Sequence, residues 1–190
     1  MRKPDGFDNV EAIGNSEYKR LPAGGYVARI TKVTDTPDKN YLQMEFDICE
    51  GEFTGYGANC MERNGFTPLN TRVYYDTNTP THDPNYEKRH KTTMGIFKGF
   101  TEAVEQSNSP YVWEWKDQTL VGRVVGVVLG EREYRKQNGD IGTAWDVRFK
   151  TAVAIREGKF KVPEKKCLPV EQNTAPSFAP IADDDGELPF

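Results

Sequence analysis

The sequence predicts a mainly-β domain in which five antiparallel strands form one sheet and a single α-helix lies between the third and fourth strands. Three observations lead to this prediction. Several segments alternate apolar and polar side chains with a period of two, which is typical of strands buried on one face. Turn-forming glycine, proline and asparagine residues separate these segments. Over residues 92–106 the apolar period lengthens to three and four residues, as in an amphipathic helix.

The chain of 190 residues has the length of one domain with appendages. Residues 1–20 are polar and patternless, and we interpret them as an N-terminal arm. The domain is expected over residues 21–170, because a turn signal at residues 21–25 leads into the first strand. Residues 171–182 are expected to form a flexible spacer, and residues 183–190 an acidic tip.

The first two strands are expected at residues 26–33 and 41–48, joined by a turn at residues 38–40. A short third strand is expected at residues 71–75. Residues 76–91 contain two prolines and scattered charge, so we expect a long loop there. The apolar face of the first hairpin is expected to hold Tyr26, Ala28, Ile30, Leu42, Met44, Phe46 and Ile48.

The helix is expected at residues 92–106, capped by Thr92 or Thr93 and ended by the polar, proline-containing segment 107–110. Because side chains three, four and seven positions apart share one helix face, this helix should bury one apolar stripe. The stripe is expected to contain Ile96, Phe97, Phe100, Ala103 and Val104.

The last two strands are expected at residues 120–134 and 145–155, around a turn at residues 138–139. Glycines recur every four residues along the fourth strand, which suits a strand coiled tightly around a small barrel. These glycines are Gly122, Gly126 and Gly130. Three strands, a helix and two strands follow one another as in a five-stranded OB barrel, which is the predicted fold.

The charge of the chain is unevenly distributed. The formal net charge is −4, but residues 171–190 hold five acidic and no basic residues. Residues 1–170 therefore carry 25 basic and 24 acidic residues and are close to neutral. A near-neutral domain permits nucleic-acid binding, provided that its basic side chains share one face.

Composition and motifs argue against several classes of protein. An apolar run long enough to cross a membrane and an N-terminal secretory signal are both missing, so cytoplasmic residence is expected. The sequence lacks nucleophile-elbow, P-loop and dinucleotide-binding motifs, so we expect neither an enzyme nor a cofactor. Cys49, Cys60 and Cys167 are widely spaced and are interpreted as reduced thiols.

Aromatic and basic residues occur together where an OB barrel holds an oligonucleotide, on strands two and three and in the loops between strands 1–2 and 4–5. Rings stack on bases while basic groups follow the phosphates. The alternative is that these residues merely fill half-exposed sheet faces. The candidate contacts with single-stranded DNA are Arg29, Lys39, Tyr41, Arg72, Tyr74, Tyr75, Lys88, Arg89, Trp113, Arg132, Tyr134, Arg135, Lys136, Arg148 and Lys150.

Two other groups of side chains allow more than one interpretation. Trp113 and Trp115 either stack on bases or cap the barrel, and at least one is expected to be structural, whereas Trp145 is expected in the core. The loop at residues 76–91 holds residues able to bind a metal, but without the spacing of a known metal motif, so no metal site is expected. These residues are His82, Asp83, Glu87 and His90. The basic residues of this loop are better interpreted as an arm over a DNA groove.

The C-terminal tip combines acidic residues with an apolar end. Acidic runs often only increase solubility, but purely solubilising tails rarely end in Leu-Pro-Phe. We therefore expect the tip to dock onto a basic partner with an apolar pocket. The partner-binding residues are Asp183, Asp184, Asp185, Glu187, Leu188, Pro189 and Phe190.

The tip DDDGELPF is similar to the acidic, Pro-Phe-ending tip of bacterial single-stranded DNA-binding proteins, with Gly-Glu inserted before Leu-Pro-Phe. Over about residues 21–165, the segments LPAGGYVARITKV, YLQMEFDICEGEFTGY, FKGFTEAVEQSN, LVGRVVGVVLGEREY and IREGKFKVPE resemble the phage- and prophage-encoded proteins of this class. The resemblance implies an OB fold and a role in replication or recombination. It does not identify contact residues.

Together these observations predict a non-enzymatic protein that binds single-stranded DNA with little sequence preference during phage DNA replication, recombination or repair. Its tip would recruit partner enzymes in the cytoplasm of an infected or lysogenic bacterial host. One alternative is an adaptor between proteins, built on the same barrel and without a nucleic-acid ligand. A less favoured alternative is a metal-dependent nuclease using His82, Asp83 and His90. The protein is a possible homo-oligomer.

Overall fold

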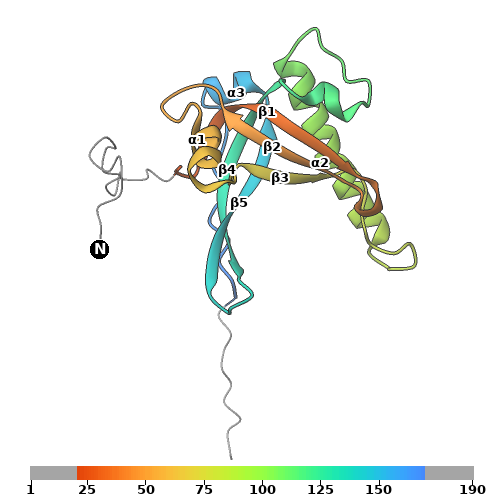
Figure 1. Cartoon of the computed structure of the whole chain (residues 1–190). Helices are drawn as coiled ribbons and strands as arrows, with labels where there is room; N and C mark the ends of the chain where they lie inside the picture. The colour runs from red at the N-terminus through yellow and green to blue at the C-terminus, as the bar shows by residue number, and fades with distance from the viewer. Residues whose placement is uncertain (1–20, 170–190) are drawn as a thin grey trace, which may run out of the picture.

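A computed structural model of the chain describes residues 21–169. One antiparallel sheet dominates it, and its strands lie in the order β3-β2-β1-β4-β5 (Figure 1). The five-stranded antiparallel sheet predicted from the alternating segments is therefore confirmed. The strands are β1 (Gly24–Thr36), β2 (Tyr41–Ile48), β3 (Asn70–Tyr74), β4 (Val124–Arg135) and β5 (Ile141–Lys150).

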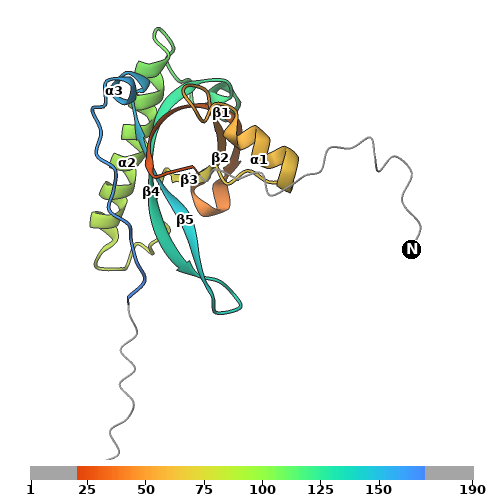
Figure 2. The same cartoon turned by 90° about the vertical axis from the view of Figure 1, so that its left-hand side faces the viewer.

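The prediction of a single helix is wrong. A helix does lie between β3 and β4, namely α2 (Tyr86–Ser107), but α1 (Tyr56–Asn64) precedes β3 and α3 (Ala152–Arg156) follows β5. Short 3-10 turns, η2 (Pro37–Lys39) and η3 (Asp117–Leu120), precede β2 and β4. Helices α1 and α2 lie at opposite sides of the sheet in both views (Figures 1 and 2).

The predicted closed barrel is also wrong. The sheet curves, as Figure 2 shows, but within residues 21–169 no ladder joins β3 to β5, so both remain edge strands. Helix α2 contacts β3, β4 and β5, and the Phe100 ring packs edge-on against Phe149 of β5 with centroids 4.9 Å apart. Because a helix side chain occupies this space, the two edges do not approach to hydrogen-bonding distance.

The first hairpin forms as its alternation predicts. Met44, Phe46 and Ile48 of β2 are at most 2% exposed and belong to the main core. In β1, Ala28 and Ile30 are buried on the same side, and a bulge between Ile30 and Lys32 shifts the register by one residue. The bulge returns Val33 to the core side, which strict alternation from Ile30 would not do.

Helix α2 begins at Tyr86, inside the segment that was predicted to be a loop. Asn85 precedes it, and the hydroxyl of Thr92, a predicted cap, instead donates to the Lys88 carbonyl within the helix. The predicted stripe is buried at Phe97, Phe100, Ala103 and Val104, but Ile96 is 63% exposed. The start of the helix could not be predicted from periodicity, because its first two turns are charged and polar and contain no repeating apolar residues.

The fourth strand begins later than predicted, because Gly122 takes a positive φ of 85° in the turn before β4. Gly126 and Gly130 do lie in β4, but they serve close approach rather than coiling around a barrel. A Cβ on Gly126 would stand 2.6 Å from Ile155 of α3, and one on Gly130 would stand 2.9 Å from Pro163. The glycines therefore allow the C-terminal segment to pack directly on the strand.

The predicted fifth strand at residues 145–155 is two elements. Strand β5 ends at Lys150, and α3 follows after Thr151, whose hydroxyl accepts a hydrogen bond from the amide of Ala154 at 3.1 Å. This side-chain cap favours a helix start where period-two alternation suggested a continued strand. Ile155 is buried against the outer face of β1 and β4 in a second, smaller apolar cluster.

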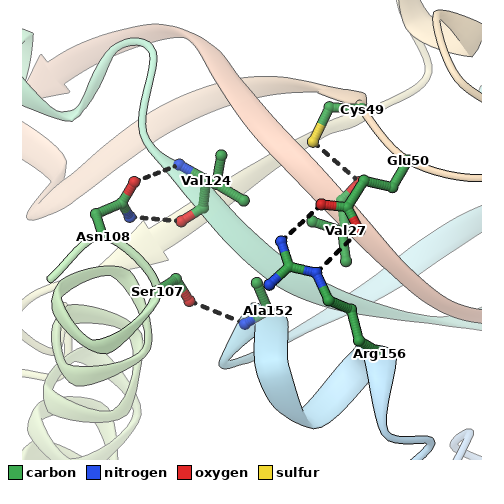
Figure 3. A network of polar contacts seen from close by, with 8 residues as sticks. All are labelled: Val27, Cys49, Glu50, Ser107, Asn108, Val124, Ala152 and Arg156. Atoms are coloured by element: carbon green, nitrogen blue, oxygen red, sulfur yellow. Dashed lines mark hydrogen bonds and ion pairs between the residues drawn. The ribbon is translucent and has the colours of Figure 1, made fainter.

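A polar network fixes the end of α2 and α3 to the sheet (Figure 3). The side-chain amide of Asn108 donates to the carbonyl of Val124 at 2.7 Å and its oxygen accepts from the amide of Val124 at 3.0 Å. The hydroxyl of Ser107 accepts a hydrogen bond from the amide of Ala152 at 2.9 Å. Arg156 donates two hydrogen bonds to Glu50, at 2.6 and 3.0 Å. Beyond α3, the chain reaches β4, where Lys166 exchanges backbone hydrogen bonds with Glu131 and Glu133.

Candidate nucleic-acid interface

A groove of about 1150 Å³ lies between the open edges of β3 and β5. Residues 71–74 of β3 form one wall and residues 146–150 of β5 form the other. Helix α2 contributes Gly99 and Phe100, and the chain after α3 contributes residues 159–161. The groove therefore occupies the place where a closed barrel would have joined its third and fifth strands.

The groove is lined by an excess of positive charge. Two carboxylates, Asp76 and Asp146, are already paired: Asp146 contacts Lys166 at 2.7 Å and Arg148 at 3.8 Å, and Asp76 contacts His90 at 2.7 Å. The hydrogen bond from His90 holds the pKa of Asp76 below its ordinary value, so this carboxylate stays ionised. The six basic lining residues are Arg72, Arg148, Lys150, Lys159, Lys161 and Lys166.

Three of these cations have no ion-pair partner within residues 21–169: Arg72, which contacts only Gln43 and the Tyr41 ring, and two lysines. Within residues 21–169, neither Lys150 nor Lys161 has an ion-pair partner, whereas Lys159 is paired with Glu157 at 2.8 Å. Unpaired basic groups in a concave site attract anions, because the surrounding low-dielectric walls concentrate the field. The groove is thus locally cationic although the chain as a whole carries a net charge of −4.

Aromatic rings stand beside these cations. Tyr74 is 37% exposed and packs edge-on against Tyr41, with centroids 5.3 Å apart. The guanidinium of Arg72 lies over the other ring of this pair, 5.1 Å from the centroid of Tyr41. This packing holds the partly exposed Tyr74 ring in the lining of the groove.

Phe160 brings a further ring to the groove from the chain after α3. A Cβ on Gly25 would stand 2.5 Å from the Phe160 ring, so only glycine at this position of β1 leaves room for the ring as it lies. This segment is not among the predicted contacts, although Lys159, Phe160 and Lys161 place an aromatic residue between two basic ones. That local pattern is the signal that could have identified it.

Four of the predicted contact residues meet in the groove: Arg72 and Tyr74 from β3, and Arg148 and Lys150 from β5. They are far apart in the sequence and come together because β3 and β5 are the two edges of one curved sheet. The prediction from the polar sides of these strands therefore identified two walls of the same cavity.

Three predicted contacts do not offer a free ring at the groove. Tyr41 is only 8% exposed, beneath Arg72 and Tyr74. Trp113 is 6% exposed, and its Nε1 donates to the carbonyl of Lys116 at 3.0 Å, so this tryptophan is structural. Tyr75, which follows β3, lines a separate cavity and not the groove.

The remaining predicted contacts lie outside the groove lining. Arg29 is exposed on β1 and donates to the carbonyl of Gly122 at 3.5 Å. Lys39 lies in η2 at the end of the first hairpin. Lys88 and Arg89 lie in the first turns of α2. The other predicted contacts lie on the outer half of the β4–β5 hairpin, which projects from the body in Figure 1. These are Arg132, Tyr134, Arg135 and Lys136.

The side chains considered for a metal site do not form one. Across the part of the chain that the structure describes, no group of three or more His, Cys, Asp or Glu residues could hold a metal ion. His90 is bonded to Asp76, whereas Asp83 accepts hydrogen bonds from the backbone and side-chain amides of Asn85. Trp145 packs partly buried against the core. The acidic tip at residues 183–190 lies outside the described residues.

No protein-family model matches the sequence, and no curated protein matches it either. Among residues 21–169, no helix is long and apolar enough to cross a membrane. The candidate interface therefore stands on the geometry and charge of the groove and on the residue patterns of the sequence.

Proposed function

We propose that the protein binds single-stranded DNA in the groove between β3 and β5, with little sequence preference and without enzymatic activity. The observation that supports this most is the groove itself, in which six basic side chains surround exposed or half-exposed aromatic rings. Lys150 and Lys161 would contact phosphates, while Tyr74 and Phe160 would stack on bases.

The chemistry of the groove favours a single strand over a duplex. Stacking on a side-chain ring requires an open base face, which a duplex does not offer, and each stacked base contributes roughly 1–3 kcal/mol. The open edges of β3 and β5 also leave backbone amide and carbonyl groups available to a ligand lying between them. Such contacts do not depend on base identity, so the proposed binding tolerates any sequence.

The proposed setting follows from the resemblance to phage- and prophage-encoded single-stranded DNA-binding proteins. In that setting the protein coats single strands during replication, recombination or repair in the cytoplasm of a bacterial host. Its acidic tip would recruit replication or recombination enzymes.

A fluorescence-anisotropy titration with labelled oligothymidine tests the proposal. We expect binding by the intact protein and a roughly tenfold loss on Tyr74→Ala, since one stacked base is removed. Arg63→Ala in the last turn of α1 is a matched surface control and should bind as the unchanged protein does. Absence of oligothymidine binding at low salt, or equal losses in Tyr74→Ala and Arg63→Ala, would rule out the groove as the DNA site.

The role proposed for the tip is tested separately by deleting residues 188–190. We expect the truncated protein to bind oligothymidine as before, because the groove is built from residues 71–166. It should fail to retain proteins that the full chain captures from an extract of a bacterial host. Equal capture by both chains would contradict recruitment through the apolar end of the tip.

A further inference from the structure

A second cavity, of about 480 Å³, is lined by residues from β1, β2, α2 and the segments that follow β3 and α2. Four aromatic rings and two carboxylates account for most of its lining: Tyr75, Phe97, Trp113, Trp115, Asp35 and Asp117. None of its lining residues also lines the groove, and none is basic. We call this cavity the aromatic pocket.

The rings of the aromatic pocket contact one another. Trp113 and Trp115 lie 4.9 Å apart between centroids, and the Phe97 ring lies 5.9 Å from Trp113 and 6.2 Å from Trp115. The Tyr75 ring meets Phe97 edge-on at 5.9 Å. The four rings thus form one connected wall.

Trp115 is the exception to the burial of this cluster. It is 70% exposed, whereas Trp113 beside it is 6% exposed and fills the core. Trp115 also has a positive φ of 61°, a left-handed conformation that is uncommon for bulky residues and costs energy. A large ring held in this conformation against solvent adds little to the core, and such outliers cluster at binding sites.

The carboxylates face the same space as the rings. Asp35 accepts a hydrogen bond from the Tyr75 hydroxyl at 3.1 Å, and Asp117 accepts one from the amide of Gln118 at 2.9 Å. Burial raises the pKa of Tyr75, and its bond to Asp35 raises it further, so the hydroxyl stays protonated as a donor. The nearest lysine in sequence, Lys116, pairs instead with Glu114 at 3.3 Å. Within residues 21–169, no ion pair neutralises Asp35 or Asp117, so this part of the lining carries negative charge.

We propose that the aromatic pocket binds an arginine side chain of a partner protein. A guanidinium plane stacks on indole and phenyl rings, and its fork of donors matches a carboxylate. Lysine would gain the attraction to the rings but not the paired hydrogen bonds. DNA is disfavoured here, since Asp35 and Asp117 would repel its phosphates.

Protein NMR tests the proposal on the full chain, through the side-chain indole signals of its three tryptophans. The probe is a short glycine-serine peptide carrying two arginines, and its matched control carries the neutral isostere citrulline in their place. We expect the arginine peptide to shift the indole signals of Trp113 and Trp115 and to leave Trp145 unmoved. The citrulline peptide should bind at least about fivefold more weakly, since the cation is lost.

Two variants connect the shifts to the pocket. Trp115→Ala should abolish saturable peptide binding detected at Trp113, and the double variant Asp35→Asn with Asp117→Asn should weaken it about tenfold. Val112→Ala, a substitution at a 70% exposed residue outside the lining, is the control and should change nothing. Peptide bound to the acidic tip would not depend on Trp115.

Equal binding of the two peptides, or unchanged binding by Trp115→Ala, would overturn the proposal. Shifts at Trp115 caused by oligothymidine but not by the arginine peptide would overturn it in favour of a second DNA contact. Because the groove and the aromatic pocket share no lining residue, failure here leaves the DNA titration unaffected.

Discussion

The groove and the aromatic pocket share no lining residue, but α2 contributes to both and aromatic rings wall both. Phe100 of α2 lines the groove, and Phe97, one turn earlier, lines the aromatic pocket. The difference is charge: six basic residues surround the groove, whereas two carboxylates and no basic residue line the pocket. Rings supply contact area to either site, but the surrounding charges select the ligand, an anion in one and a cation in the other.

Charge reversal in the groove is expected to have the largest effect. The double variant Lys150→Glu with Lys161→Glu replaces two unpaired cations by anions and should lower oligothymidine affinity at least about a hundredfold. The measurement is anisotropy at about 50 mM salt, where ionic screening is weak. Arg63→Glu with Lys98→Glu changes the net charge equally outside both cavities and should have little effect.

The same charge-reversal variant also tests whether the groove and the aromatic pocket are independent sites. Arginine-peptide binding, followed by the Trp115 indole signal, should be unchanged in the groove variant because the aromatic pocket is intact. A parallel loss of peptide binding would show that the two cavities are one site.

The second-largest effect is expected from salt, which should weaken ligand binding much more in the groove than in the aromatic pocket. If about four phosphates are neutralised in the groove, oligothymidine affinity should fall roughly 50-fold between about 50 and 200 mM salt. Binding of one arginine in the pocket involves one charge and no condensed counterions, so it should fall only about threefold or less over the same range. Titrations of both ligands at the two salt concentrations measure this, and a flat response for oligothymidine would contradict a phosphate-lined groove.

A smaller effect, on the free energy of unfolding, is expected when the packing of Phe160 against Gly25 is disturbed. Gly25→Ala puts a methyl group where the Phe160 ring lies, 2.5 Å from its nearest atom, and should cost about 1–2 kcal/mol of the free energy of unfolding. It should also weaken oligothymidine binding, because the ring must move. Denaturant unfolding measures the first effect.

Gly95→Ala in α2 is the matched control for this substitution. No heavy atom outside its own helix lies within 4 Å of the added Cβ, so alanine should stabilise the helix by up to about 1 kcal/mol. Equal effects at the two glycines would show that Phe160 does not pack against Gly25 in solution.

The smallest effect concerns the ion pair that fastens α3. The hydrogen bonds from Arg156 hold the pKa of Glu50 below its ordinary value of 4.5. A lowered folded-state pKa contributes stability above pH 4.5, and this contribution is lost as the pH falls through the folded-state value. Both side chains are largely exposed, so the effect is small. The stability advantage over Glu50→Gln should shrink below pH 4.5, as measured by denaturant unfolding, and not above it.

Local periodicity was enough to predict the sheet and most of the buried stripe of α2. In β2 every second side chain from Leu42 to Ile48 is buried, as the apolar alternation of the sequence predicts. In residues 151–155 the same alternation misled, because the cap at Thr151 starts a helix. The site was predicted in part: Arg72, Tyr74, Arg148 and Lys150 lie together. Phe160 was missed, because its local pattern does not reveal that the ring packs on Gly25 of β1.

The sequence by itself determined which segments become strands, which face of each is apolar, and that basic side chains lie on the polar faces of β3 and β5, accompanied on β3 by an aromatic one. Only the tertiary structure decided that these two edges stay apart. Closure of the sheet depends on whether side chains from α2, distant in sequence, occupy the space between the edges. Phe100 of α2 packs there against Phe149, so a groove lies between β3 and β5 where a closed barrel would have a hydrogen-bonded strand pair. The charges around each cavity are likewise a result of packing, since they come from segments that no local pattern connects.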